Sequence, residues 1–279
     1  MVENKVDPIR NSEINHITSF DEDFWINKAT ILKKLIDDST LRESILGENK
    51  ESHFLLYEIF STKLHCCETL LRLLIIAKKK HFYPLLPLIR LKFPKFQKEF
   101  EFMKENSKKY FDTEFFKSNF YPFKELDSEQ VEKSISFLEN SIKYIIKEYD
   151  DHMANNVFKH GFYGRTTTNV SLSIENKPIG TSPNMIEWFE IDQFKDHHKL
   201  HHHSKSISVE REFNVIKICS SIIKQFFKIK RGVIKKEKSI TMSFFNDVPL
   251  GKIFSVYQEG ITIGQLHFEY EVQLPKDFP

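Results

Sequence analysis

Two long runs of apolar residues at helical spacing constrain the fold of this chain more than any other feature. Within residues 51–80, apolar side chains recur three and four positions apart and define one face of a helix. Within residues 129–160 the same spacing continues until Gly161, a residue type that commonly ends helices. We therefore expect two long helices, the first of them central to the core. Their apolar faces comprise Leu56, Phe60, Leu64, Cys67, Leu71 and Leu74 in the first, and Val131, Ile135, Leu138, Ile142, Ile145, Tyr149, Met153 and Val157 in the second.

The rest of the N-terminal half predicts shorter elements. Residues 1–20 are polar and predict a loose arm. A helix is expected to begin near 21–23, where acidic residues favour a helix N-terminus. Three prolines between 84 and 94 interrupt the helical pattern, so residues 85–120 predict short helices with irregular joints.

After Arg165 the pattern of the sequence changes. Residues 166–176 alternate in polarity and are rich in β-branched side chains, which predicts a strand. Residues 180–206 contain glycine, proline and many histidines and predict mostly loop, whereas residues 208–230 predict a helix. Three short strands are expected near 239–245, 252–257 and 261–272.

These patterns predict an α+β fold. A mainly helical bundle over residues 1–165 is followed by a smaller strand-containing part over residues 166–279. The change near residue 165 is a shift in composition and not a linker, so packing of both parts as one unit is the alternative.

Composition and missing motifs exclude several classes of function. The net charge of +2 does not select an anionic partner, and we attribute the 27 phenylalanines and abundant lysines to coding bias. There is no glycine-rich phosphate loop and no hydrolase motif. Cys66, Cys67 and Cys219 form neither a zinc pattern nor a disulfide framework. Without a signal segment or a bilayer-spanning stretch, we expect a cytoplasmic protein with no membrane, cofactor or metal partner.

One segment, NNVFKHG at residues 155–161, has the character of a site. Helical spacing places Glu148, His152, Asn156 and His160 on one face. One interpretation is a helix end, because basic residues such as His160 suit a helix C-terminus. The other is catalytic, because a histidine that titrates near neutrality can act as a general acid or base.

The helical N-terminal half, the Asn-x-x-x-His pattern and the following glycine resemble the HEPN domains, a family that includes metal-independent ribonucleases of toxin, abortive-infection and CRISPR systems. The resemblance covers roughly residues 50–165 and implies that His160 handles protons, that Asn156 is the polar motif residue and that two chains pair. The family's motif begins with an arginine, with about four to six residues between it and the histidine. Asn155 occupies that place at the shortest spacing, and Ala154 and Met153 occupy it at the longer ones, so none of the three places holds an arginine. Since asparagine is uncharged, stabilisation of the phosphate would need another cation.

Several residues are candidates for that cation. Lys159 and Arg165 are close in sequence, and the first long helix carries a polar stripe of Ser61, His65, Glu68 and Arg72 at spacings of three and four. If this stripe faces the histidine, Arg72 supplies the cation and Glu68 orients an imidazole. The alternative is that the stripe is the solvated edge of an amphipathic helix.

Two further segments are rich in basic or histidine residues that could bind a ligand. Residues 224–238 carry seven basic residues against one acid, a pattern that either binds RNA phosphates or forms a solvated helix end. Its RNA-binding candidates are Lys224, Lys228, Lys230, Arg231, Lys235 and Lys236. In the run from His197 to His203, His197 and His201 could chelate a metal if helical, but we expect a loop without a physiological metal.

Three functions are consistent with the sequence. The first is a HEPN-like endoribonuclease of a bacterial defence or toxin system, acting as a homodimer. The second is a non-catalytic module that binds RNA or a protein partner, such as an antitoxin or another defence component. The third is a structural or regulatory protein in which His160 only ends a helix.

Overall fold

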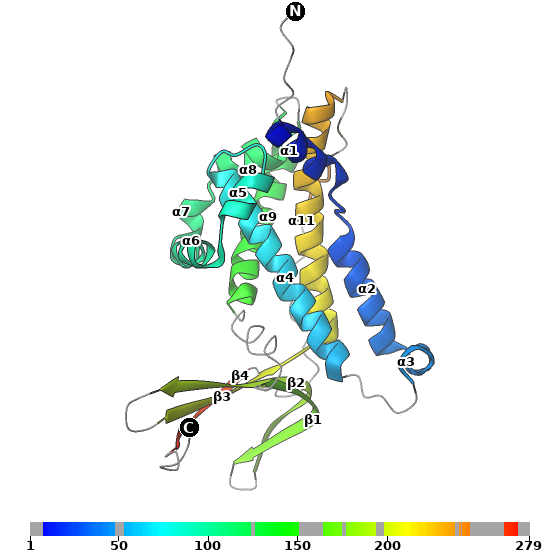
Figure 1. Ribbon diagram of the computed structural model, residues 1–279, viewed down its shortest axis with the longest axis vertical. Coiled ribbons are helices and arrows are strands. Elements are labelled where there is room, and N and C mark those ends of the chain that lie inside the picture. Colours follow the sequence, from blue (N-terminus) through cyan, green and yellow to red (C-terminus); the bar gives the residue numbers. More distant parts are fainter. Residues whose placement is uncertain are drawn as a thin grey trace, which may run out of the picture. The chain divides into compact units, whose positions relative to one another are not determined.

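The structure, a computed structural model, describes residues 8–47, 53–123, 126–150, 164–174, 177–193, 198–237, 240, 242–245 and 265–272. Over these ranges the chain is α+β and mainly helical, as the sequence predicts. Figure 1 shows the elements α1 (Pro8–Ser19), α2 (Phe24–Asp37), α3 (Ser39–Leu46), α4 (His53–Lys78), α5 (Leu85–Arg90), α6 (Phe93–Glu105), α7 (Ser107–Tyr110), α8 (Thr113–Phe120), α9 (Ser128–Tyr149), β1 (Gly164–Ile174), β2 (Lys177–Gln193), β3 (His198–Ser206), α11 (Val209–Lys235) and β4 (Gln265–Val272).

The described residues divide into two compact units. The first unit takes its residues from Met1–Asn27, His65–Tyr149 and Val215–Lys252. The second takes them from Lys28–Leu64, Asp150–Asn214 and Ile253–Pro279. Each unit therefore combines segments from both sides of residue 165, and α2, α4 and α11 contribute residues to both.

The two long helices expected from the sequence are present. α4 lies within the predicted range, and α9 begins at Ser128, where Oδ1 of Asp127 accepts a hydrogen bond from the Glu129 N–H at 2.9 Å. The apolar positions predicted along α9 as far as Tyr149 are buried. The predicted continuation of this helix to residue 160 lies outside the described residues.

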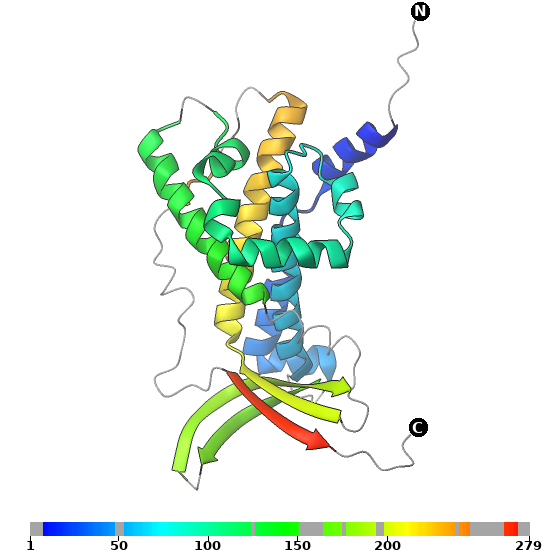
Figure 2. The same ribbon diagram turned by 90° about the vertical axis from the view of Figure 1, so that its left-hand side faces the viewer.

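In the first unit, α4 and α11 lie side by side (Figures 1 and 2), and their cysteines contact one another and Ser220. Sγ of Cys67 lies 3.8 Å from Sγ of Cys219, and Sγ of Cys66 lies 3.8 Å from Oγ of Ser220. All three thiols are buried and free. The cysteines thus behave as small core residues where two helices approach closely.

Much of the phenylalanine in the chain fills the same core. Phe96 and Phe100 of α6 meet Tyr149 edge-on, with ring centroids 5.7 and 5.0 Å apart. Phe226 and Phe227 of α11 are also buried. These rings pack against one another within the protein, so Phe226 and Phe227 are core residues and not an exposed stacking platform.

The prediction of a loose arm at the N-terminus is wrong for residues 8–19, which form α1. Ile17 of this helix is fully buried, and Phe20 just after it stacks on Phe227 with centroids 4.0 Å apart. The carboxylate of Glu13 also accepts hydrogen bonds from the N–H groups of Leu85 and Leu86. Because these contacts are tertiary, the polar sequence of α1 gave no sign of them.

The strands form one antiparallel sheet in the order β1-β2-β3-β4 (Figure 2). β1 confirms the strand predicted over residues 166–176, and β4 lies within the strand predicted over residues 261–272. The strand predicted near 239–245 is absent from its described residues, 240 and 242–245. The strand predicted near 252–257 lies outside the described residues.

The loop predicted over residues 180–206 is wrong, because β2 and β3 occupy most of this range. Met185, Ile186 and Trp188 of β2 are buried and supply the apolar side chains that a strand needs. Pro183 lies where β2 is paired with β1 but not yet with β3, whose pairing starts at Met185. Proline is tolerated there because its missing N–H is not required for a second ladder.

The core of the second unit joins one helix to the sheet. Leu56, Phe60 and Leu64 of α4 pack with Ile186 and Trp188 of β2, and Ile207 completes this cluster. A buried ion pair lies beside it, with Nζ of Lys63 at 2.8 Å from Oε2 of Glu212. In the part of the chain that the structure describes, no helix combines the length and the hydropathy required to cross a membrane.

Candidate functional site

The predicted catalytic segment falls outside the described part of the chain. Asn155, Asn156, Lys159 and His160 belong to residues 151–163, between the end of α9 and the start of β1. The side chain of Arg165 also lies outside the described set. The catalytic roles of these residues therefore stay predictions.

A polar network holds the last residue of α9, just before that segment. Oε1 of Glu68 accepts a hydrogen bond from Nε of Arg72 at 2.7 Å, and Oε2 of Glu68 accepts one from the Tyr149 hydroxyl at 3.1 Å. Burial, together with the negative charge of Glu68, raises the pKa of Tyr149, so its hydroxyl remains a donor even in alkaline solution. The network therefore fixes Tyr149, the last helical residue before the predicted catalytic segment.

The guanidinium of Arg72 is engaged on several sides. It lies over the ring of Phe96, 4.1 Å from the centroid, and its Nη1 donates to the carbonyl oxygen of Leu91. Only 18% of the Arg72 side chain is exposed, and Glu68 offsets its charge. Of the other residues on the predicted polar stripe, Ser61 is buried. The stripe is thus not uniformly solvated, and Arg72 acts as a partly buried, ion-paired residue.

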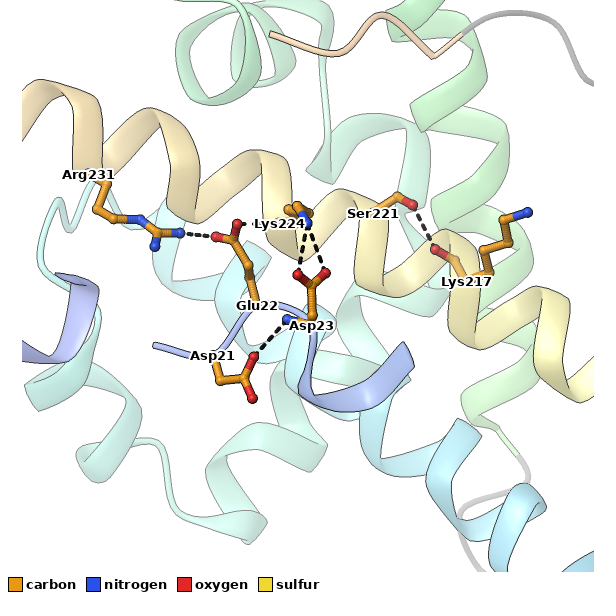
Figure 3. A network of polar contacts seen from close by, with 7 residues as sticks. All are labelled: Asp21, Glu22, Asp23, Lys217, Ser221, Lys224 and Arg231. Carbon is orange, nitrogen blue, oxygen red and sulfur yellow. Dashed lines mark hydrogen bonds and ion pairs between the residues drawn. The ribbon is translucent and has the colours of Figure 1, made fainter. Parts of the chain in front are cut away.

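The basic run on α11 is divided by its surroundings. Nζ of Lys224 lies 2.9 Å from both carboxylate oxygens of Asp23, and Arg231 forms an ion pair with Glu22 (Figure 3). Lys224 also approaches Glu22 at 3.9 Å. The acidic turn before α2 therefore neutralises two of the six cations predicted to bind RNA.

Lys230 differs from these two because it is buried, with 7% of its surface exposed. Its Nζ donates to the carbonyl oxygen of Phe82 at 2.8 Å and lies 4.5 and 4.6 Å from the ring centroids of Phe82 and Phe226. Burial lowers the pKa of the Lys230 ammonium to about 8. The side chain lines a cavity of about 320 Å³.

The remaining candidates are more accessible. Lys228 is half-buried, whereas Lys235 and Lys236 are exposed at the C-terminal end of α11. These last two fit the interpretation of a solvated helix end. Of the six predicted RNA-binding residues, they are the ones that the structure leaves exposed.

The pKa of Lys230 predicts a pH dependence of stability. A folded pKa near 8, below the ordinary 10.5, means that the charged form opposes folding fully below pH 8 and that this opposition fades as pH rises towards 10.5. Between pH 7 and pH 10, we expect the wild type to gain about 2 kcal/mol of unfolding free energy relative to Lys230→Met. Urea unfolding of both proteins at each pH measures this difference, and parallel profiles would contradict it.

The histidine run lies on a strand. His201, His202 and His203 belong to β3, where His203 stacks on Trp188 and His202 stacks on Phe189, with centroids 5.1 and 4.6 Å apart. Chelation through a four-residue helical spacing does not apply to His201 on a strand, and His197 lies outside the described residues. Across the ranges that the structure describes, no group of three or more His, Cys, Asp or Glu side chains is placed to hold a metal ion.

In comparisons with known protein families, curated proteins and solved structures, nothing matched this chain. Inference about its function therefore depends on its own residues and geometry.

The sequence reasoning missed the features that separate the basic residues. The acidic triplet of residues 21–23 was interpreted only as a helix start, although its charge is complementary to the basic run. The burial of Lys230 had a weaker signal, namely its position four residues after the buried Phe226 on the apolar face of α11. The charge complementarity of residues 21–23 and the basic run is thus visible in the sequence, whereas the burial of Lys230 depends on tertiary packing.

Proposed function

We propose that this protein targets RNA through the segment after α9, as a HEPN-like, metal-independent endoribonuclease of a bacterial defence or toxin system. The observation that supports this best is the network of Glu68, Arg72 and Tyr149, which anchors the last residue of α9. A partly buried ion pair fixes Tyr149, the last residue of α9, and catalytic groups are usually supported by such fixed elements.

The chemistry follows from the residue types. His160 takes the proton from an RNA 2′-hydroxyl as that oxygen attacks the adjacent phosphorus, and the 5′-oxygen leaves with a proton from an imidazolium. Asn156 hydrogen-bonds the phosphate. Two chains pair so that their histidines share one cleft, and the protein works in the cytoplasm, alone or with an antitoxin or defence protein.

The test is RNA cleavage in the presence of EDTA. Since general acid–base catalysis contributes at least about 100-fold, His160→Ala is expected to lower the cleavage rate by about that factor without a change in melting temperature. His53→Ala, at the first residue of α4, is the control and should retain activity. Arg72→Met tests whether Arg72 replaces the motif arginine. Absence of wild-type cleavage, or equal rates for the two histidine variants, would contradict the enzymatic proposal.

A second candidate, RNA binding without cleavage, is favoured by one observation. At the shortest spacing Asn155 occupies the place of the motif arginine, and Arg72, the one cation candidate for the phosphate whose side chain is described, is already paired with Glu68. In that case the exposed Lys235 and Lys236 should bind RNA with an affinity that falls steeply with salt. Binding of equal strength at low and high salt would exclude this candidate.

A further inference from the structure

A cavity of about 320 Å³ in the first unit is separate from the segment proposed to act on RNA. Its polar lining comes from Lys80 and His81 after α4, from Ser118 and Asn119 of α8, and from Lys230 of α11. Among the described residues none of the acidic ones lines it, and Phe82 adds an aromatic wall that is 38% exposed. This volume suits a small ligand.

The positive charge of Lys230, which lines this cavity, is not offset by a carboxylate among the described residues. Lys230 is 7% exposed and its ammonium donates to one carbonyl, that of Phe82, yet none of the described residues gives it a carboxylate partner. A buried cation is unfavourable unless an anion compensates it. Ser118 and Asn119 already donate to the carbonyl oxygen of Phe115, so the lysines and His81 are the groups left for an anion.

The backbone at Lys80 gives a second observation. After the end of α4, the N–H of Lys80 donates a hydrogen bond to the carbonyl oxygen of Ala77, and the N–H of His81 donates one to that of Ile76. Lys80 has a φ of 59°. Glycine is the preferred residue at such a left-handed position, because any other residue is strained there. Here a lysine occupies it, and this residue lines the cavity.

Strain alone does not identify a site, because α11 ends in the same way. Lys236 has a φ of 52° with the equivalent hydrogen bonds from Lys236 to Val233 and from Glu237 to Gly232. Lys236 does not line the cavity. The chain therefore contains a matched control, a lysine of the same conformation away from the proposed site.

We propose that this cavity binds a phosphomonoester carried on an aromatic group, such as a nucleoside monophosphate. Lys230 and Lys80 neutralise the phosphate dianion, His81 adds a donor, and Phe82 contacts the base. Lysine is a common point-charge partner of phosphate, and two lysines match the charge of a dianion better than that of a carboxylate. The ligand is a free nucleotide or the 5′-phosphate of an RNA, and it is independent of the cleavage proposed above.

The experiment is calorimetric titration of the full chain with adenosine monophosphate at constant ionic strength. Adenosine and chloride serve as ligands without phosphate. Because a charge-assisted contact to the buried lysine is lost, Lys230→Met is expected to weaken binding at least about tenfold. Lys80→Gly should weaken it by about threefold to tenfold. Lys236→Gly should leave the affinity for the mononucleotide unchanged, because the RNA contacts considered for Lys236 lie outside the cavity.

The two glycine variants also exclude misfolding as a cause. Each relieves a left-handed lysine, so each should raise the melting temperature by about 2 °C. Of these two variants, only Lys80→Gly should bind adenosine monophosphate more weakly while its melting temperature rises. A 5′-phosphorylated oligonucleotide is compared with its 5′-hydroxyl form and with the mononucleotide. If the phosphorylated oligonucleotide binds more tightly than both, the natural ligand is the 5′-phosphate of an RNA. Equal effects of the two glycine variants, or no preference for the monophosphate over adenosine, would overturn the proposal.

Discussion

Lys63→Met is expected to lower the free energy of unfolding by about 3–5 kcal/mol, the range found when one partner of a buried ion pair is removed. Nζ of Lys63 lies 2.8 Å from Oε2 of Glu212, and their side chains are 0% and 1% exposed. Removal of the ammonium leaves the Glu212 carboxylate buried. Arg211 lies farther from it, at 3.5 Å, and compensates incompletely.

A double variant separates the stabilisation by the Lys63–Glu212 ion pair from the cost of a buried, unpaired charge. Lys63→Met combined with Glu212→Leu should return to within about 1 kcal/mol of the wild type or exceed it, because apolar pairs often replace buried ion pairs without loss. The matched control is the exposed pair of Lys133 and Glu129, whose side chains are 58% and 76% accessible. Lys133→Met should change stability by less than about 0.5 kcal/mol. Similar losses for Lys63→Met and Lys133→Met in urea unfolding would contradict this prediction.

The sequence predicted the elements whose signal repeats over many residues. In α4 and α9 the apolar positions recur for several turns, and burial of one face requires that repetition. Among the described side chains of α1, Ile17 is the one fully buried apolar residue, so this helix lacked such a signal. β2 and β3 were missed because Pro183 and the histidines resemble loop residues, whereas pairing with neighbouring strands decides their structure.

The candidate sites depended still more on distant contacts. The basic run is continuous in sequence, yet Asp23 and Glu22, about two hundred positions earlier, neutralise Lys224 and Arg231. Lys230, between them in sequence, is directed to a cavity by the turn of the helix. A charge pattern gives the number of cations but not their partners, so sequence could not decide which of them remain available to a ligand.

Glu13→Ala is expected to lower the free energy of unfolding by about 3 kcal/mol, the second large effect. Its carboxylate is 5% exposed and accepts hydrogen bonds from the Leu85 and Leu86 N–H groups at 2.8 and 2.7 Å. These are the first two residues of α5, and the N-cap Pro84 makes no side-chain hydrogen bond to them. Glu13 of α1 therefore caps a helix 72 positions later, where its charge is also favoured by the helix dipole.

The size of the effect follows from the charge of the acceptor. A hydrogen bond to a charged group contributes about 1.5–3 kcal/mol, and its loss leaves two amides without the acceptor they now have. Glu13→Gln keeps one carbonyl oxygen and should lose about half as much. Ser12→Ala, next to it but exposed, is the control.

Hydrogen exchange distinguishes loss of this cap from a general loss of stability. In Glu13→Ala the amides of Leu85 and Leu86 should exchange much faster than those of α9, because α5 opens locally before the rest of the unit. In Ser12→Ala both sets should keep their wild-type rates. Unchanged exchange at Leu85 and Leu86 in Glu13→Ala would show that the Glu13 carboxylate does not hold α5. The packing of α1 would then depend on apolar and aromatic contacts such as those of Ile17, His16 and Phe20.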